Sequence, residues 1–370
     1  MADNKDKKVL NVPALRFPEF TGEWERHKLS EVCSFYSGGT PSSSKKEYYN
    51  GNIPFIRSGE LHKDYTELFI TEAGLSNSAA KLVETGDLLL ALYGATSGDI
   101  AISKIKGAIN QAILCIRTKQ NKKFIESVWN KHVERLLQTY LQGGQGNLSA
   151  DIVKNIPFYF ANSNEQDKLA KFISLLDERI ATQNKIIEKL QSLIKGLAAQ
   201  LTQSGTPNIR LCDCLECHSS TLQENCVSVT GSYPVYGATG LIGYTNNYAY
   251  NGESILIVKD GSGVGSLSYV NDHFSVIGTL NYLTAKENYS ILYLYYALMA
   301  FNFTPYITGM AIPHIYFKDY GKAKLFYPSI EKRIRIASLL HNIEQKLVVE
   351  QNLVISLSAQ KSYLLRMLFI

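Results

Sequence analysis

One apolar pattern occurs twice in this chain of 370 residues, at a constant distance of 167 residues. In the first copy, positions spaced alternately four and three apart form a heptad seam, which predicts a long helix that packs against a second helix. The members of this seam are Leu169, Ile173, Leu176, Ile180, Gln183, Ile187, Leu190, Ile194, Leu197 and Leu201. Adding 167 to each number gives Ile336, Leu340, Ile343, Leu347, Glu350, Val354, Leu357, Lys361, Leu364 and Leu368.

We expect the two helices to bury these seams on each other as an intramolecular antiparallel coiled coil. Each helix would span roughly 55 Å at 1.5 Å per residue. Gln183 and Glu350 occupy the same position in the two copies, and a polar pair of this kind fixes helix register at some cost in stability. Lys361 interrupts the second seam. The alternative interpretation is that each helix packs only on its own globular neighbour.

The segments between the helices also repeat. The stretch "GDLLLALYGATSGD" from Gly86 parallels "GESILIVKDGSGVG" from Gly252, and each predicts a turn, a buried strand and a glycine-rich loop. Likewise, "AINQAILCIR" from Ala108 parallels "SVIGTLNYLT" from Ser275. The sequence therefore predicts an α+β fold of two similar mixed α/β domains joined by two long helices. The predicted domains are 1–160 and 207–328, and the predicted helices are 161–206 and 329–370.

The charge is unevenly distributed along the chain. The formal net charge is +5, yet residues 208–320 hold four Lys and Arg against eight Asp and Glu. A protein that coats nucleic acid without sequence preference should be more basic throughout. The charged N-terminus is not typical of a signal peptide, and the apolar run from Ile291 to Phe303 is too short and too rich in tyrosine to span a bilayer. We expect a soluble, cytoplasmic protein with no membrane partner.

The sequence contains no catalytic constellation that we recognise. The glycine-rich segments lack the lysine of a phosphate-binding loop and the spacing of a dinucleotide fingerprint, and no nucleophile elbow is present. An adenine methyltransferase would need a Pro-Pro dipeptide, which this chain does not have. Four cysteines, Cys212, Cys214, Cys217 and Cys226, lie close to His218. They fit either a zinc site or free thiols, with Cys212 and Cys214 on a short strand. We expect no metal and no cofactor on this chain.

Several segments, in their order and in duplicate, resemble the specificity subunit of type I restriction-modification systems. They are "FPEFTGEWERHKLSEVCSFYSGGTPS", "IPFIRSGEL", "GDLLLALYGATSGD" and the helix openings "EQDKLAKFISLLDERI" and "EKRIRIASLLHNIEQKL". The resemblance covers nearly the whole chain. It implies two target recognition domains related by a pseudo-two-fold axis, each reading one half of a bipartite DNA site, with the helix pair setting the distance between the halves.

The resemblance also implies partners that carry out the chemistry. These are two adenine-N6 methyltransferase subunits, which use S-adenosylmethionine, dock on the helix ends and flip the target base. Two restriction subunits driven by ATP and Mg²⁺ would complete the complex. Together they would support host defence through DNA methylation and DNA cleavage.

The candidate DNA-reading residues are polar or glycine positions in predicted loops. In the first domain they are Ser37, Gly38, Thr40, Arg57, Ser58, Tyr93, Thr96, Gln111 and Gln145, and in the second they are Tyr236, Thr239, Lys259, Ser262 and His314. Arg57 suits a guanine edge and Gln111 an adenine edge. Each can equally be a turn residue or a solvated side chain. Two other function classes compete: a coiled-coil scaffold that binds no DNA, and a zinc enzyme built on the cysteine cluster.

Overall fold

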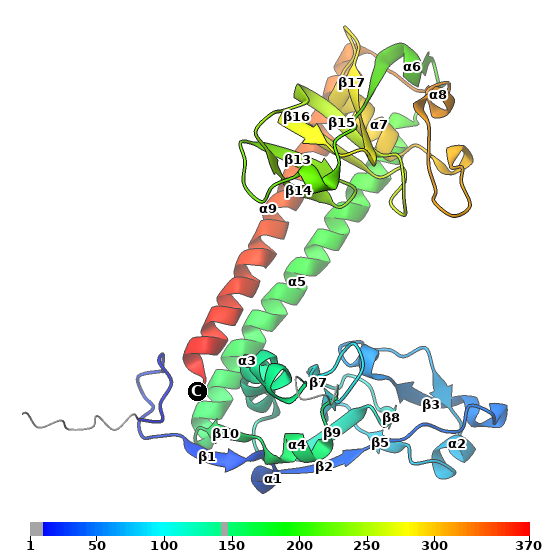
Figure 1. The fold of residues 1–370 in the computed structure, drawn as a ribbon. Helices are drawn as coiled ribbons and strands as arrows, with labels where there is room; N and C mark the ends of the chain where they lie inside the picture. The colour runs from blue at the N-terminus through cyan, green and yellow to red at the C-terminus, as the bar shows by residue number, and fades with distance from the viewer. Residues whose placement is uncertain (1–9, 142–146) are drawn as a thin grey trace, which may run out of the picture. The chain divides into compact units, whose positions relative to one another are not determined.

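A computed structural model describes residues 10–141 and 147–370 (Figure 1). The chain divides into two compact units. Unit 1 contains Met1–Thr182 and Val354–Ile370, and unit 2 contains Gln183–Leu353. Two long helices, α5 (Ser163–Thr202) and α9 (Ile330–Leu368), each continue from one unit into the other. No helix in the described part of the chain is long and apolar enough to cross a membrane.

Unit 1 is built on two four-stranded sheets, in the orders β2-β9-β6-β7 and β4-β3-β8-β5, and a two-stranded sheet β1-β10. Its strands are β1 Glu25–Lys28, β2 Cys33–Ser37, β3 Tyr49–Ile56, β4 Phe69–Ile70, β5 Lys81–Val83, β6 Leu88–Ala91, β7 Ile100–Ile102, β8 Gly107–Ile109, β9 Ile113–Thr118 and β10 Pro157–Phe160. Its shorter helices are α1 Leu29–Val32, η1 Lys46–Tyr48, η2 Ser58–Glu60, α2 Glu72–Ser76, α3 Lys122–Leu141 and α4 Ala150–Asn155.

Unit 2 has one six-stranded sheet in place of the two four-stranded sheets of unit 1, in the order β12-β17-β15-β16-β13-β14, beside a two-stranded sheet β11-β18. Its strands are β11 Ile209–Arg210, β12 Leu215–Ser219, β13 Tyr233–Gly237, β14 Gly240–Thr245, β15 Tyr250–Val258, β16 Leu267–Val276, β17 Leu280–Ala285 and β18 Lys324–Leu325. Its shorter helices are α6 Leu211–Cys214, η3 Glu224–Cys226, α7 Ile291–Met299, η4 Thr304–Tyr306 and α8 Phe317–Tyr320.

The helix pair is the predicted one. Every seam position named above is buried or half-buried. Within unit 2, the Gln183 amide donates a hydrogen bond to the Glu350 carboxylate, so these two equivalent polar positions lie opposite each other near the middle of the antiparallel pair. The α+β architecture with two long helices is therefore confirmed. The division into four segments at residues 160, 206 and 328 stays a prediction.

Lys361, which departs from the apolar pattern, has an ionic role in unit 1. Its ammonium lies 2.5 Å from Oδ1 of Asp177 on α5, and the ammonium of Lys123 on α3 lies 2.6 Å from Oδ2 of the same carboxylate. Burial alone would raise the pKa of Asp177, but the hydrogen bonds from the two lysines outweigh burial and lower that pKa. Lys361 thus ties the helix pair to α3 instead of weakening the seam.

The duplication extends to individual backbone hydrogen bonds. In unit 1, the amide of Gly98 donates to the carbonyl of Ala91 at 2.8 Å, and in unit 2 the amide of Gly265 donates to that of Val258 at 2.8 Å. The two donors, Gly98 and Gly265, are 167 residues apart, and so are the two acceptors, Ala91 and Val258. The structure therefore aligns β6 with β15 at this offset, one residue away from the alignment of Gly86 with Gly252. That alignment was wrong because Gly252 lies inside β15, whereas Gly86 lies in the turn before β6.

The cysteine segment also differs from its expected structure. Leu211–Cys214 forms the short helix α6, not a strand, and the strand β12 begins only at Leu215. The Asp213 carboxylate accepts a hydrogen bond from the amide of Arg210, which closes the first turn of α6. The sequence pattern did not reveal this local helix cap.

We expect Gly98→Ala to destabilise unit 1. Gly98 has φ +86°, and an added Cβ would lie 2.9 Å from Val133 and 3.0 Å from Leu137. Left-handed backbone alone costs an L-residue about 1–2 kcal/mol, so the free energy of unfolding should fall by at least that amount. Both tryptophans, Trp24 and Trp129, belong to unit 1, so their fluorescence during urea unfolding reports this unit.

Gly59→Ala is the matched control for Gly98→Ala. Gly59 has no left-handed φ, and nothing lies within 4 Å of the position that an added Cβ would occupy. The control should change the unfolding free energy by less than about 1 kcal/mol. Equal stability of the two variants would contradict the expected strain at Gly98.

We expect Asp177→Asn to destabilise unit 1 by about 1–2 kcal/mol at pH 7, because it leaves two half-buried lysines without their shared carboxylate. Lys361→Met should have a smaller effect, since Asp177 keeps Lys123 and the seam gains an apolar residue. The folded pKa of Asp177 is lowered, so its stabilisation is present above the unfolded pKa of about 3.9 and is lost as the pH falls through the folded value. Urea unfolding at pH 7 and at about pH 3 should show the gap between wild type and Asp177→Asn narrowing; a gap that does not depend on pH would exclude this role.

Candidate nucleic-acid interface

Three loops of unit 1 that are distant in sequence meet at one edge of its sheets. The amide of Leu92 donates to the carbonyl of Ala112 at 2.8 Å, which joins the loop after β6 to the turn before β9. The hydroxyl of Thr40 donates to Oε1 of Gln111 at 2.5 Å. A Cβ at Gly38 would lie 1.8 Å from the carbonyl oxygen of Ile109, so only glycine fits there. We call this edge the unit 1 loop edge.

Unit 2 has the same arrangement, which we call the unit 2 loop edge. The amide of Lys259 donates to the carbonyl of Thr279 at 3.0 Å, and the two residues are the equivalents of Leu92 and Ala112. The amide of Ile277 donates to the carbonyl of Tyr236 at 3.0 Å, and that of Gly261 donates to Pro313 at 2.9 Å. The backbone therefore brings four separate segments of unit 2 to one edge.

The candidate readers are not equally accessible. The exposed ones are Thr40, Arg57, Gln111, Thr239 and Ser262, and the half-buried ones are Ser37, Gly38, Ser58, Tyr93, Thr96, Tyr236, Lys259 and His314. Gln145 lies outside the described residues. Tyr93 and Tyr236 pack against the cores of their units, and burial, together with Asp272, raises the pKa of Tyr236. The phenol of Tyr236 is therefore a neutral hydrogen-bonding group.

Arg57 is engaged within its own unit. Its guanidinium lies 2.8 Å from Oε1 of the buried Glu60 and 3.4 Å from Oε2 of Glu67. These carboxylates raise the pKa of Arg57, while the contacts with Arg57 and Thr66 lower the pKa of Glu60 in spite of burial. To bind a guanine edge bidentately, the guanidinium of Arg57 would have to break its hydrogen bonds with Glu60. The sequence did not indicate this pairing, although the two residues are only three apart.

His62 fixes the end of the glycine-rich loop of unit 1. Its Nε2 lies 2.8 Å from Oδ1 of Asp99, the last residue of the loop, and this hydrogen bond raises the pKa of His62. At the same end of the loop, the indole of Trp129 donates to the carbonyl of Gly98 at 2.7 Å. The exposed imidazole of His62 and the buried indole of Trp129 therefore both fix the end of this loop.

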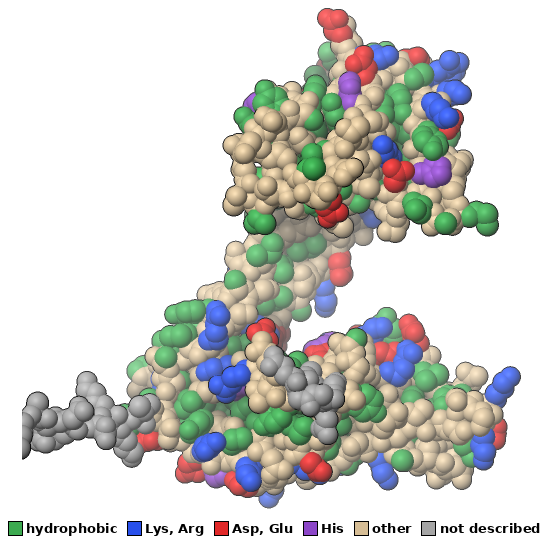
Figure 2. Space-filling view, viewed as in Figure 1, with side chains coloured by type: hydrophobic (Ala, Val, Ile, Leu, Met, Phe, Trp, Pro, Cys, Tyr) green, Lys and Arg blue, Asp and Glu red, His purple; other side chains and the backbone are tan. Residues whose placement is uncertain are grey.

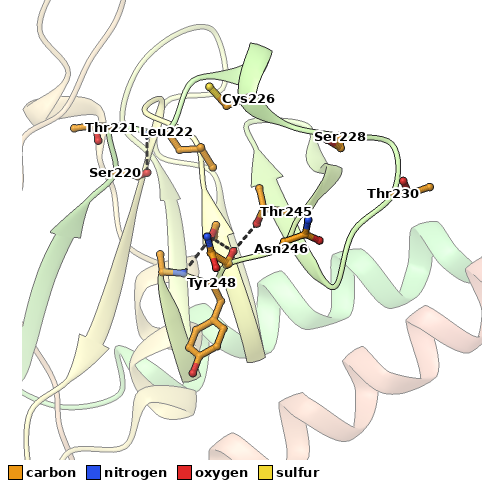
Figure 3. Close-up of a pocket in the computed structure, with 12 residues that line it drawn as sticks. Ser220, Thr221, Leu222, Cys226, Ser228, Thr230, Thr245, Asn246 and Tyr248 are labelled. Carbon is orange, nitrogen blue, oxygen red and sulfur yellow. Dashed lines mark hydrogen bonds between the residues drawn. The ribbon is translucent and has the colours of Figure 1, made fainter.

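Sequence reasoning missed a polar cavity in unit 2 (Figure 3). The cavity measures about 550 Å³, and hydroxyl and amide side chains supply most of its lining, with no charged residue. Ser228, Thr230 and Asn246 are among the side chains drawn there, and Cys226 lies at its upper rim. None of the candidate readers lines it. The only sequence signal is the run of Ser, Thr and Asn between 219 and 232 and again at 245–247.

A second unforeseen cavity, in unit 1, is basic. It measures about 620 Å³, and its charged lining consists of Arg26, Lys131 and Arg135, with His132 beside them. Burial, followed by the neighbouring charge of Arg135, lowers the pKa of Lys131. The helical spacing of Lys131 and Arg135 on α3 was the available signal, but the contribution of Arg26 from β1 depends on the pairing of β1 with β10.

The cysteines have no disulfide partners, and no group of three or more potential metal ligands occurs within 10–141 and 147–370. Burial raises the pKa of the Cys214 thiol to about 12 and that of Cys217 to about 11. Metal binding requires the thiolate, so both residues are poor ligands in this environment.

The surface of unit 2 over β13–β16 is largely uncharged in the view of Figure 2, where polar and apolar atoms dominate and charged side chains are scattered. This agrees with the small number of charged residues in 208–320, which are four Lys and Arg and eight Asp and Glu. Any contact of this face with DNA would rest on hydrogen bonds and apolar packing more than on charge.

Comparison with known proteins identifies the family. A sequence profile for the type I restriction modification DNA specificity domain matches residues 21–192 and again 209–357. The EcoprrI type I restriction enzyme specificity subunit of Escherichia coli is 24% identical over 358 residues, which cover 85% of this chain and 86% of that protein. The EcoR124I/EcoR124II specificity subunit of the same species is 27% identical over 187 residues, covering 48% of this chain and 45% of that protein.

Solved structures share the fold. The S subunit of the type I restriction-modification system from M. genitalium superimposes with a TM-score of 0.66 at 17% identity, covering 97% of this chain and 99% of that one. A chain from a structure of type I R-M complex assembly gives a TM-score of 0.54 at 15% identity, covering 92% and 96%. Since the specificity-domain profile matches twice and covers most of the sequence, this chain belongs to the type I restriction-modification DNA specificity family.

Proposed function

We propose that the chain is the DNA-recognition subunit of a type I restriction-modification complex, in which each unit reads one half of a bipartite site. The observation that carries this proposal is the repeated loop edge. The same backbone hydrogen bonds, 167 residues apart, bring separate loops together in both units and leave polar side chains exposed. Two similar readers in one chain suit a site made of two half-sites separated by bases that are not read.

The helix pair would set the distance between the half-sites. α5 has 40 residues and α9 has 39, and each is continuous. At 1.5 Å per residue, such a helix extends about 60 Å. Because a continuous helix cannot shorten without losing hydrogen bonds, its length would fix the number of unread base pairs.

The same helices would dock the methyltransferase subunits. They expose large apolar side chains away from the seam, namely Leu175, Ile186 and Leu193 of α5 and Ile330, Ile334, Leu339, Val348, Val349, Ile355 and Tyr363 of α9. Exposed apolar side chains repeated along two helices would suit a protein interface if a partner covers them together. We propose that two methyltransferase subunits with S-adenosylmethionine cover it and that two restriction subunits with ATP and Mg²⁺ join them, so that the chemistry belongs to the partners.

Gln111 is the best-supported reader at the unit 1 loop edge. Its side chain is exposed, and the hydroxyl of Thr40 binds its Oε1, which orients the amide before any DNA arrives. A pre-oriented glutamine amide suits the N6/N7 edge of adenine. At the unit 2 loop edge, we assign base reading to Lys259, although Gln111 itself corresponds to Gly278, and Ser262 and His314 lie in the same set of hydrogen-bonded segments.

A coiled-coil scaffold that binds no DNA is the second candidate function, and the acidic balance and uncharged face of unit 2 favour it. The affinity of the assembled complex for DNA at two salt concentrations separates the two candidates. Phosphate contacts make DNA affinity fall steeply with salt.

The proposed function predicts one bipartite methylation motif with a fixed gap when the chain is co-expressed with the methyltransferase encoded next to it. Single-molecule sequencing of host DNA would map the methylated adenines. Deleting Ile173–Leu176 together with the equivalent Leu340–Ile343 removes about one turn from each helix. We expect this double deletion to change the gap or abolish methylation. A complex that forms but modifies no motif would favour the scaffold.

Single substitutions should relax recognition in one half-site only. Gln111→Ala should reduce discrimination at one base of one half-site by about 1–3 kcal/mol, as expected for a lost bidentate contact. Lys259→Ala should act on the other half-site. Asn52→Ala, which removes an exposed amide from β3, is the control and should leave the motif unchanged. The same sequencing assay measures all three, and loss of discrimination in both half-sites with any single variant would refute the separate readers.

A further inference from the structure

The loop from Thr308 to His314 has a fixed conformation. The amide of Thr308 donates to the carbonyl of His314 at 2.9 Å, and the amide of His314 donates back to Thr308 at 2.8 Å. Gly309 has φ +91°, and a Cβ there would lie 2.3 Å from the carbonyl oxygen of Ile312. The imidazole of His314 also lies 3.2 Å from that carbonyl. A tight turn closed by reciprocal hydrogen bonds therefore determines which side chains point outward.

The base of this loop is part of the unit 2 loop edge. The amide of Gly261 donates to the carbonyl of Pro313, and the amide of the buried Ile315 donates to the carbonyl of Lys259, each at 2.9 Å. Figure 1 shows the segment between α7 and α8 extending away from the sheet of unit 2. The base of the loop is therefore hydrogen-bonded to Lys259 and to Gly261, the residue before the candidate reader Ser262.

The tip is apolar where the rest of the edge is polar. Met310 is fully exposed and Ile312 is 65% exposed, with Ala311 exposed between them. At the base of the loop, Lys259 is followed by Asp260, which pairs with His314, and Lys318 is followed by Asp319. A rigid loop that holds two large apolar side chains in water at the unit 2 loop edge is suited to a target with apolar surface.

We propose that the 308–314 loop inserts Met310 and Ile312 between adjacent base pairs of one half-site and unstacks a single base step. This inference rests on the proposed function and adds a means of deforming the DNA. Methionine and isoleucine are among the side chains that proteins use as such wedges. DNA sequence would then be read partly through the ease of deforming that step.

The size of the tip favours duplex DNA over a protein partner as the target. A stable protein interface engages about 20–30 residues on each side, whereas this tip presents three. The equivalent positions in the first half are Gly143, Gly144 and Gln145, none of which is a large apolar residue. The proposal therefore predicts unstacking in one half-site and not in the other.

The test uses the complex with its methyltransferase and a duplex carrying the mapped site, with 2-aminopurine placed in turn at each position except the methylated adenines and their neighbouring bases. Its fluorescence rises when the base loses its stacking neighbour. Wild type should give a several-fold rise at one step of one half-site. The double variant Met310→Ser/Ile312→Ser should return that signal to the level of free DNA and weaken binding to the site by about tenfold, while Val229→Thr, at another exposed apolar residue of unit 2, should change neither.

Each outcome is decisive. Site-specific binding by wild type without a step that brightens would overturn the wedge and leave the proposed function standing. Absence of site-specific binding would overturn both. If the double variant fails to assemble with the methyltransferase in the absence of DNA, the loop is a protein contact and the wedge is wrong. Brightening in both half-sites would also contradict it, because the equivalent positions in the first half hold no large apolar residue.

Discussion

The packing of α5 against α9 is the constraint on which the rest of the structure depends, because neither unit has a complete core without both helices. In unit 1, Leu169 and Ile173 of α5 share a core with Leu365 and Leu368 from the end of α9. In unit 2, the end of α5 contributes Ile194 to a core that also holds residues of α9. The two halves of the sequence are therefore interlocked: each gives part of a helix to the unit formed mainly by the other.

Aromatic contacts and hydrogen bonds to a carboxylate reinforce this exchange of helix ends between the two units. The ring of Phe369, beyond α9, lies 5.4 Å from Phe124 and 6.4 Å from Trp24 in unit 1. In unit 2, Glu344 of α9 accepts hydrogen bonds from Tyr295 at 2.9 Å and Tyr296 at 2.7 Å. Burial and this carboxylate raise the pKa of both phenols, so they remain donors over the physiological range. A change in either helix end would thus act on a globular core as well as on the helix pair.

The sequence predicted the features that periodicity encodes. The heptad seam identified the two helices and the polar pair of Gln183 and Glu350. Periodicity does not encode partners contributed by other elements. Lys361 interrupts the apolar seam, and its ionic role is not visible in the sequence because Asp177 and Lys123 come together with it only after folding. The alignment of Gly86 with Gly252 was wrong by one residue for a similar reason. The two glycines match in sequence, but the hydrogen bonds of the folded strands determine the register.

The candidate site was predicted less completely. Loop composition identified the segments that meet at each edge, because glycine and small polar residues mark loops whatever their tertiary contacts. It did not reveal that Glu60 engages Arg57, or that Arg26 joins Lys131 beside a cavity, because those contacts depend on side-chain direction and strand pairing.

The difference in charge between the two units has a consequence for recognition in the proposed function. Phosphate contacts supply affinity that carries no sequence information, whereas hydrogen bonds and DNA deformation discriminate between sequences. Unit 2 has few cations and a largely uncharged face, so it gains little from phosphates alone. It would contribute mainly where the correct bases are present, while affinity for any DNA would come from unit 1 and the partner subunits. A reader with weak affinity for DNA in general spends less time on incorrect sites, and this favours a complex that must find one bipartite sequence among many.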